Sequence, residues 1–370
     1  MSSLGDPAHG RANNWNLIRL VLATMVLLTH SYALVTGDPI NEPLRRTYGL
    51  TLGTIAVDGF FVASGFLVTA SVTRERGIAY FVASRCLRIY PGLWVMLLLT
   101  VFGLGAWCTT LRWADYLGSA RTLGYLARTA TLVTGVRFEL PGVFASNPFA
   151  SVFNGSLWTL PYEVGAYACL FAVSLAARIC EPRDRRITLG RLVLGAWLLS
   201  LLGLWGAGAT GSAWTTTLRL LQMFFAGAAL HGLRDRLRPT RVAIAGVALS
   251  FVALFAHPVV LKIGYPLLLP LLVVLAAHGD AGRLRGAGRF GDYSYGIYIY
   301  AFPVQQCLIF VGQGASVAEL AVKSFVVTLA LAVASWHLVE KPCIGRKRAM
   351  AEALRRLSAG GAKRLGIRWG

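Results

Sequence analysis

The sequence predicts an all-α membrane protein, a polytopic helix bundle of about ten transmembrane helices with both termini in the cytoplasm. Its composition is the first indication, because 56% of the 370 residues are hydrophobic and only 14% are charged. A soluble domain carries about 25% charged residues. The second indication is the net charge of +20 in so apolar a chain. A basic nucleic-acid-binding arm would also be positively charged, but it would be poor in Leu, Val and Phe. We therefore expect no nucleic-acid partner and interpret the excess of Arg as a sign of membrane topology.

Apolar runs of about 17–25 residues bounded by charged residues are typical of transmembrane helices. Ten such runs occur, once the stretch 242–278 is split at His257-Pro258: 15–36, 52–73, 87–107, 157–177, 191–208, 214–231, 242–257, 259–278, 291–312 and 317–338. An even number of spans places both termini on one side. The first run is long and holds polar and charged residues, so we expect a retained span and no cleaved signal peptide.

The distribution of basic residues sets the orientation. Of the 36 Lys and Arg residues, 26 map to the side of the termini and six to the opposite loops. Cytoplasmic loops carry the excess of Lys and Arg, so both termini are predicted to be cytoplasmic. Residues 1–345 form the expected membrane domain, and 346–370 a solvated basic tail. The six Cys lack CxxC or Cys/His spacing, so free thiols and no metal site are expected.

Few ionisable residues lie within the spans, where such groups are costly and usually face a cavity or a partner. At a rise of about 1.5 Å per residue, four of them lie about 8–9 Å below the outer face: His30, Asp58, Glu163 and Arg219. A single buried His is more often a hydrogen-bonded core residue, but a His and two carboxylates at one level indicate a functional polar site. A carboxylate beside an imidazole stabilises the imidazolium, as a general base requires. Arg219 fits this site or a structural ion pair with Asp58 or Glu163.

Three arginines predict an anion site at the cytoplasmic mouth. Arg19 and His30 are eleven residues apart, so they share one helix face with about 16 Å between them. Arg85 and Arg88 stand at i, i+3 near a helix N-terminus, where forked donors and the helix dipole favour phosphate. By themselves these two would be topology anchors. With Arg19 they predict an anionic ligand whose narrow arm reaches the level of His30.

Six segments in order along the chain resemble the motifs of acyltransferase family 3, the integral-membrane O-acyltransferases. They are RLVLATMVLLTHSY (19–32), AVDGFFVASGFLVTAS (56–71), RCLRIYPGLW (85–94), GSLWTLPYEVGAY (155–167), GDYSYGIYIYAFPV (291–304) and HLVEKP (337–342). Thr159 stands where the family has Ser, and Ala301 where many members carry His. The ten spans match the family's membrane core.

The resemblance implies an enzyme of the bacterial inner membrane that transfers an acyl group, usually acetyl from acetyl-CoA, to a carbohydrate or lipid-linked sugar. No permanently bound cofactor is expected; acyl-CoA, the sugar acceptor and membrane lipid are the expected partners. The assigned roles are as follows: Arg19, Arg85 and Arg88 hold the CoA phosphates; His30 is the general base, oriented by Glu163 or Asp58; Trp158, Arg219, Tyr298 and Tyr300 bind substrate.

Two alternatives stay open from the sequence. The acceptor hydroxyl attacks the thioester directly, or the reaction passes through an acyl-His intermediate. Residues 108–156, too long for a simple turn, are expected to select the acceptor.

A transporter or flippase for a lipid-linked or anionic substrate is the other class of protein that buried ionisable groups fit. The absence of an internal repeat and of paired broken helices argues against it.

Overall fold

The computed structural model describes residues 13–73, 77–180, 184–280 and 291–364, and in this part of the chain it is helical, without a β-strand. The longer helices are α2 (Trp15–Thr36), α4 (Leu52–Thr73), α5 (Ile78–Leu98), α9 (Thr159–Cys180), α10 (Arg185–Thr210), α11 (Thr215–Gly232), α12 (Arg241–Ala253), α13 (Pro258–His278), α14 (Ser294–Phe310), α15 (Val317–Ser335) and α17 (Lys347–Arg364). The shorter ones are α3 (Pro43–Tyr48), α6 (Ala106–Cys108), α7 (Trp113–Gly118), α8 (Ala120–Thr131) and α16 (Lys341–Gly345). The predicted all-α class is confirmed. Of the predicted domain and tail, residues 1–12 and 365–370 lie outside the described part.

Seven helical segments of the described chain are long and apolar enough to cross a membrane. They are Trp15–Thr36, Leu52–Thr73, Ile78–Cys108, Gly155–Cys180, Ile187–Gly208, Pro258–His278 and Val317–Gly345. Three of the ten predicted runs fall outside this set, those of α11, α12 and α14. The apolar helix Arg241–Ala256 is short, and α14 has 17 residues. The protein is thus a multi-pass membrane protein, while ten spans and cytoplasmic termini stay predictions.

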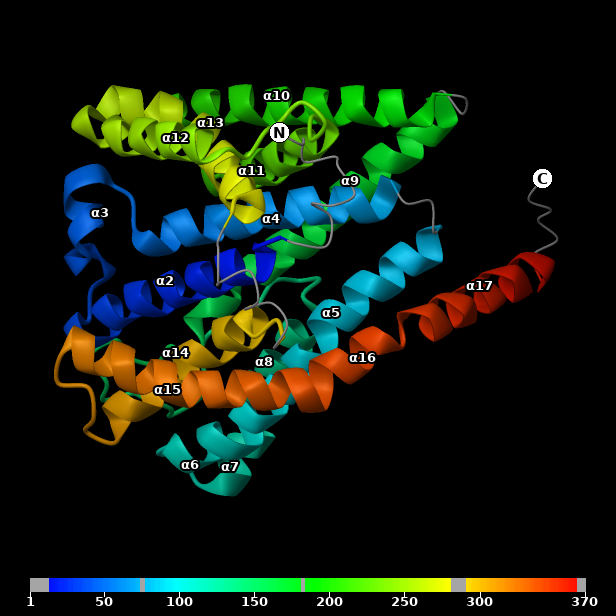
Figure 1. Cartoon of the computed structure of the whole chain (residues 1–370). Coiled ribbons are helices and arrows are strands. Elements are labelled where there is room, and N and C mark those ends of the chain that lie inside the picture. Colours follow the sequence, from blue (N-terminus) through cyan, green and yellow to red (C-terminus); the bar gives the residue numbers. More distant parts are fainter. Residues whose placement is uncertain (1–12, 74–76, 181–183, 281–290, 365–370) are drawn as a thin grey trace.

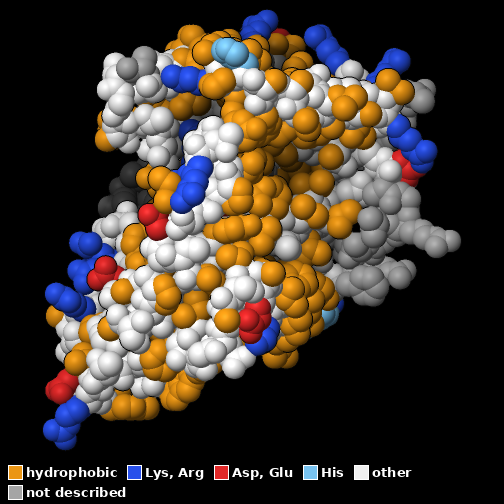
Figure 2. All heavy atoms as spheres, turned by 90° about the vertical axis from the view of Figure 1, so that its left-hand side faces the viewer, with side chains coloured by type: hydrophobic (Ala, Val, Ile, Leu, Met, Phe, Trp, Pro, Cys, Tyr) orange, Lys and Arg blue, Asp and Glu red, His pale blue; other side chains and the backbone are white. Residues whose placement is uncertain are grey.

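The long helices lie side by side, and α2 and α4, like α14 and α15, run in opposite directions (Figure 1). Helix α2 packs between α4 and α14, α11 packs between α4 and α10, and α15 packs on α14. Helix α17 packs along α5. We call the end of the bundle where α4 ends, α5 begins and α17 lies the basic end. Figure 2 looks onto the other end of the bundle, the left-hand side of Figure 1, and shows hydrophobic side chains over its middle with charged groups scattered around them.

Large apolar side chains point outward along several helices. Among the most exposed are Leu199 (72%), Val242 (83%), Leu249 (71%) and Val322 (66%). A soluble protein rarely exposes contiguous apolar surface of this kind. In a bilayer such side chains face lipid, so the outward-facing surfaces of α10, α12 and α15 indicate where the hydrocarbon lies.

Small residues allow the tightest helix crossing, between α4 and α11. A Cβ atom on Gly65 would lie 1.8 Å from the carbonyl oxygen of Phe224, and one on Gly227 would lie 2.1 Å from that of Val62. The two backbones therefore touch where these glycines face each other. This contact fixes the position of α4 against α11.

The segment before α9 enters the bundle before the apolar run begins. Asn147 Nδ2 donates to the side chain and carbonyl of Gln306 at 2.7 and 2.9 Å, and Asn154 Nδ2 donates to the carbonyl of Ile299 at 2.9 Å. Both acceptors lie within α14. Leu157 is fully buried, so the chain is already inside the bundle where α9 begins.

Candidate functional site

A cavity of about 300 Å³ lies between α2, α4, α5, α9 and α14, and we call it the central cavity. Its lining includes four basic side chains (Arg19, Arg85, Arg88 and Lys347), two carboxylates (Glu163 and Asp292) and the aromatic residues Phe60, Phe61, Tyr167, Tyr295, Tyr298 and Trp336. All three arginines predicted to bind an anion are therefore brought together. The cavity combines a cationic part with aromatic and aliphatic walls.

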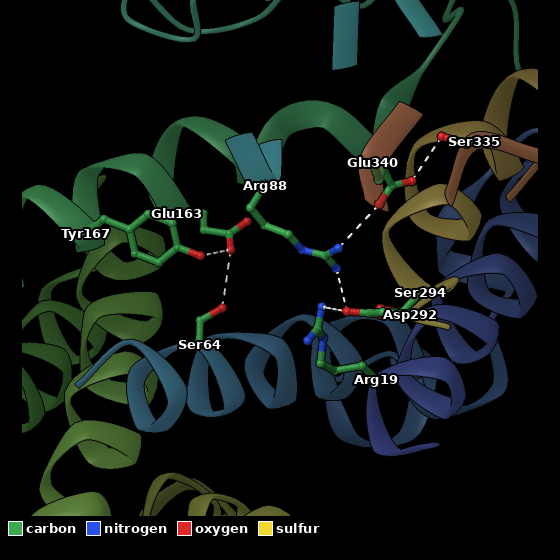
Figure 3. Close-up of polar contacts among 9 residues, drawn as sticks. All are labelled: Arg19, Ser64, Arg88, Glu163, Tyr167, Asp292, Ser294, Ser335 and Glu340. Carbon is green, nitrogen blue, oxygen red and sulfur yellow. Dashed lines mark hydrogen bonds and ion pairs between the residues drawn. The ribbon is translucent and has the colours of Figure 1, made fainter. Parts of the chain in front are cut away.

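Asp292 joins two of these arginines (Figure 3). Its Oδ2 lies 2.5 Å from Arg19 Nη2 and 2.7 Å from Arg88 Nη2, while its Oδ1 accepts from Ser294 Oγ at 2.6 Å. Arg88 also reaches Glu340 at 3.3 Å. The two arginines are less than one-fifth exposed and the carboxylates 10% and 1%. Buried charges persist when they are paired in this way, so this network fixes the direction of both guanidinium groups.

Glu163 faces the same cavity from α9. Ser64 Oγ donates to its Oε1 at 3.3 Å, and the Tyr167 hydroxyl donates to the same oxygen (Figure 3). The guanidinium of Arg85 lies 5.7 Å from the centre of the Tyr167 ring, in a cation–π contact. The carboxylate thus orders the wall against which Arg85 rests.

Tyr298 closes the cavity on the side away from the basic end. Its hydroxyl lies 2.5 Å from Thr159 Oγ1 and donates to the Ser156 carbonyl at 2.7 Å. The Phe60 ring packs edge-on against it, 5.8 Å away. Phe60, Thr159 and Tyr298 line the central cavity, and these contacts form a partition of side chains across the bundle.

His30 lies beyond this partition and outside the cavity lining. Its ring packs edge-on on Phe302 at 5.0 Å, and its Nδ1 is buried without a hydrogen-bond partner in the described part of the chain. The hydroxyl oxygen of the neighbouring Thr29 accepts a hydrogen bond from the backbone amide of Gly53, in α4. Ser64 is eleven residues further along α4, about 16 Å away along the helix axis. The structure therefore does not bring Glu163 to His30.

Asp58, fully buried, binds other partners. It accepts from Arg219 Nη1 at 2.6 Å and from the Tyr265 hydroxyl at 2.7 Å. Its two oxygens are occupied, and this pair ties α4 to α11 and α13. Arg219 thus stands in the structural pair that the sequence left as one of its alternatives, and neither residue lines the central cavity. Within the residues described, no hydrogen bond or ion pair joins the imidazole of His30 to a carboxylate.

The remaining predicted substrate residues lie around the partition. Tyr298 lines the cavity, whereas Trp158 and Tyr300 do not. Trp158 is half-buried and packs edge-on against Tyr162 at 5.8 Å. Tyr300 is 5% exposed. Across the described ranges, no group of His, Cys, Asp and Glu could hold a metal ion.

Sequence reasoning missed Asp292, Glu340 and Lys347. Asp292 opens the segment GDYSYG, and Glu340 lies in HLVEKP, so both were quoted for resemblance without a role. Lys347 was assigned to the tail. The available signal for Asp292 and Glu340 was an acidic residue at the edge of an apolar run. Such a residue is a candidate partner for an arginine within another span.

These features define a class: a multi-pass membrane protein with a buried, charged cavity suited to an anionic ligand. The sequence profile of the family described as an acyltransferase domain matches residues 13–337. The chain belongs to this family, acyltransferase family 3, and it is an integral-membrane O-acyltransferase. The predicted resemblance is confirmed, and the enzyme class prevails over the transporter alternative.

Three relatives cover nearly the whole chain. The chain is 32% identical to the O-acetyl transferase of Shigella phage Sf6 over 91% of its own length and 97% of the relative's. It is 29% identical to nodulation protein 10 of Rhizobium leguminosarum bv. viciae, over 93% and 96%. It is 28% identical to the exopolysaccharide production protein ExoZ of Rhizobium meliloti, over 86% and 97%. No solved structure matches the chain.

Proposed function

We propose that this protein transfers an acetyl group from cytoplasmic acetyl-CoA to a sugar hydroxyl of a surface polysaccharide or its lipid-linked precursor, at the outer side of a bacterial inner membrane. The names of the phage O-acetyl transferase and of the exopolysaccharide production protein support the acetyl group and the carbohydrate. The excess of basic residues on one side supports entry of the donor from the cytoplasm.

The central cavity is the observation that carries the proposal. Its arginines suit the phosphates of CoA, because forked guanidinium donors match phosphate oxygens. Its aromatic and aliphatic walls lead from the basic end to Tyr298 and suit the uncharged pantetheine arm. The thioester then has to pass the Phe60–Tyr298 partition to reach His30.

At His30 the acceptor hydroxyl gives its proton to an imidazole nitrogen while its oxygen attacks the thioester carbonyl carbon. The carbon–sulfur bond breaks, and the CoA sulfur leaves with the proton that the imidazolium returns. Glu163 and Asp58 act at a distance from this step in the proposal. Glu163 holds Tyr167 and Ser64 in the donor wall, and Asp58 anchors α4 through Arg219.

The test compares wild type with His30→Ala, both purified in lipid nanodiscs. Mass analysis of surface glycans from a deletion strain identifies the acceptor, and free thiol released from acetyl-CoA with that acceptor gives the rate. His30→Ala is expected to lose about 100-fold or more, the range of general-base catalysis. His257→Asn, at an exposed histidine whose ring caps α13, is the control and should keep the wild-type rate. Equal turnover by His30→Ala would refute the base, and unchanged glycans in the deletion strain would refute the carbohydrate acceptor.

A further inference from the structure

Two of the four cations of the central cavity are neutralised by carboxylates of the protein. Arg19 and Arg88 are both held by Asp292, and Arg88 also by Glu340. Because these guanidinium groups have buried anionic partners, a phosphate has to compete with Asp292 for them. The charge available to an incoming anion therefore has to come from the other two cations.

Arg85 is one of the two. In the described part of the chain it has no carboxylate partner; its guanidinium rests on the Tyr167 ring, and its Nε donates to Ser84 Oγ at 3.4 Å. Neither contact balances its charge with an ion. The residue is partly exposed and lines the central cavity, so its remaining donors are available to a ligand there.

Lys347 is the second cation of the cavity that has no carboxylate partner among the described residues. It is the first residue of α17 and lines the cavity together with Ile344 of α16. Among the residues described, it has no hydrogen bond or ion pair, and it is partly buried. Helix α17 packs along α5, the helix that carries Arg85. A lysine without a partner at the edge of a cavity is a point charge well suited to phosphate.

We propose that Lys347 binds a phosphate group of the acyl donor together with Arg85, and that α17 is therefore part of the donor site. Lys347 lies beyond the residues 13–337 matched by the family profile, so the profile does not include this contact. The inference rests on the proposed function, because it takes CoA as the donor. Lipid headgroups carry the same phosphate chemistry, so the experiment separates the two sources.

Binding is measured by calorimetry on the full chain in nanodiscs of phosphatidylcholine only. The probes are CoA, dephospho-CoA, which lacks the 3′-phosphate, and pantetheine, which has no nucleotide. Lys347→Gln is expected to weaken CoA binding about tenfold and to leave pantetheine binding unchanged. Lys347→Arg should restore most of the affinity. Arg348→Gln, at the exposed neighbour that does not line the cavity, is the matched control and should bind CoA like wild type.

Wild-type affinity for CoA in Lys347→Gln, with loss of binding in Arg85→Gln, would overturn the role of Lys347 and leave the proposed function standing. Equal weakening of CoA binding and pantetheine binding in Lys347→Gln would also overturn the role of Lys347, because such a result would indicate a general change in the cavity. If wild type bound no CoA but bound added short-chain phosphatidylglycerol, and Lys347→Gln weakened that binding, the phosphate would be that of lipid and both proposals would fail.

Discussion

At the scale of single residues, Asp292 is the group on which most of the site's geometry depends. Asp292→Asn leaves Arg19 and Arg88 facing each other without the shared negative charge. Breaking a buried ion pair from one side costs about 3–5 kcal/mol of unfolding free energy, and partial exposure of the arginines places the expected loss near the lower figure. Denaturant unfolding in detergent measures it.

Asp280→Asn is the matched control, because Asp280 pairs with Arg241 where both side chains are exposed, 47% and 85%. An exposed pair contributes about 0–1 kcal/mol, so this variant should unfold almost like wild type. Equal stability of the two variants would show that the Arg19–Asp292–Arg88 network does not hold the site together.

Glu42 gives a prediction for pH. It is 1% exposed and accepts the amide of Leu52 and the hydroxyl of Thr29. Burial raises the pKa of this carboxyl above its ordinary value, although these hydrogen bonds and Arg45 oppose the shift. A raised folded-state pKa means that the unfolded chain loses its proton first, so stability falls as pH rises from the unfolded pKa through the folded one.

Glu42→Gln removes this titration while keeping an oxygen for the Leu52 amide. The variant is expected to be more stable than wild type at pH 8 and to match it near pH 4. Thermal unfolding across this range checks the sign. A variant less stable than wild type at every pH would contradict the prediction.

The arrangement of the site residues was predicted where local spacing determines it. Arg85 and Arg88 stand one turn apart, so their shared face follows from helix geometry. The partners of Arg19 and Arg88 could not be found in this way. Asp292 lies 273 residues from Arg19, and only the packing of α2, α5 and α14 brings them together.

At the scale of helices, the α4–α11 crossing determines how close the two walls of the bundle come. Gly65→Ala places a Cβ 1.8 Å from the Phe224 carbonyl oxygen, a backbone atom that cannot move aside without shifting α11. We expect overpacking to cost about 1–3 kcal/mol or more, measured as a lower unfolding temperature of the purified protein.

Gly246→Ala in α12 is the helical control, since a Cβ there meets nothing within 4 Å. Alanine is favoured over glycine in a helix by about 1 kcal/mol, so this variant should keep or gain stability. A stable Gly65→Ala with normal CoA binding would mean that α4 and α11 lie further apart than the structure shows.

Helix α9 shows why the neighbours of Glu163 could not be predicted by counting residues along the span. Its apolar run begins near Leu157, but the preceding chain is already inside the bundle, where Asn154 and Asn147 donate to α14. Polar side chains that satisfy backbone groups within the bundle leave no apolar signal. Glu163 was therefore predicted near His30 and lies instead beside Ser64, in the wall of the central cavity.

At the scale of the whole molecule, the sequence predicted the class and the order of helices because apolar length and charge bias are properties of the chain itself. The number of spans depends on more than composition. Helix α14 is apolar and 12 of its 17 residues are buried, yet 17 residues are short for a bilayer. Burial by protein on all sides removes the requirement that a helix match the lipid thickness by itself.

The sidedness is the last prediction. With cytoplasmic termini and ten spans, the turn between α14 and α15 lies on the outer side of the membrane, and the turn after α11 lies on the cytoplasmic side. Ala315 and Asp235 are exposed in these two turns. Single cysteines at these positions are introduced after the six native ones are replaced by serine or alanine. Ala315→Cys is expected to react with a membrane-impermeant maleimide in intact cells, and Asp235→Cys only after permeabilisation. Labelling of both from outside would reverse or break the ten-span order, and the donor would then reach the central cavity from the wrong side of the membrane.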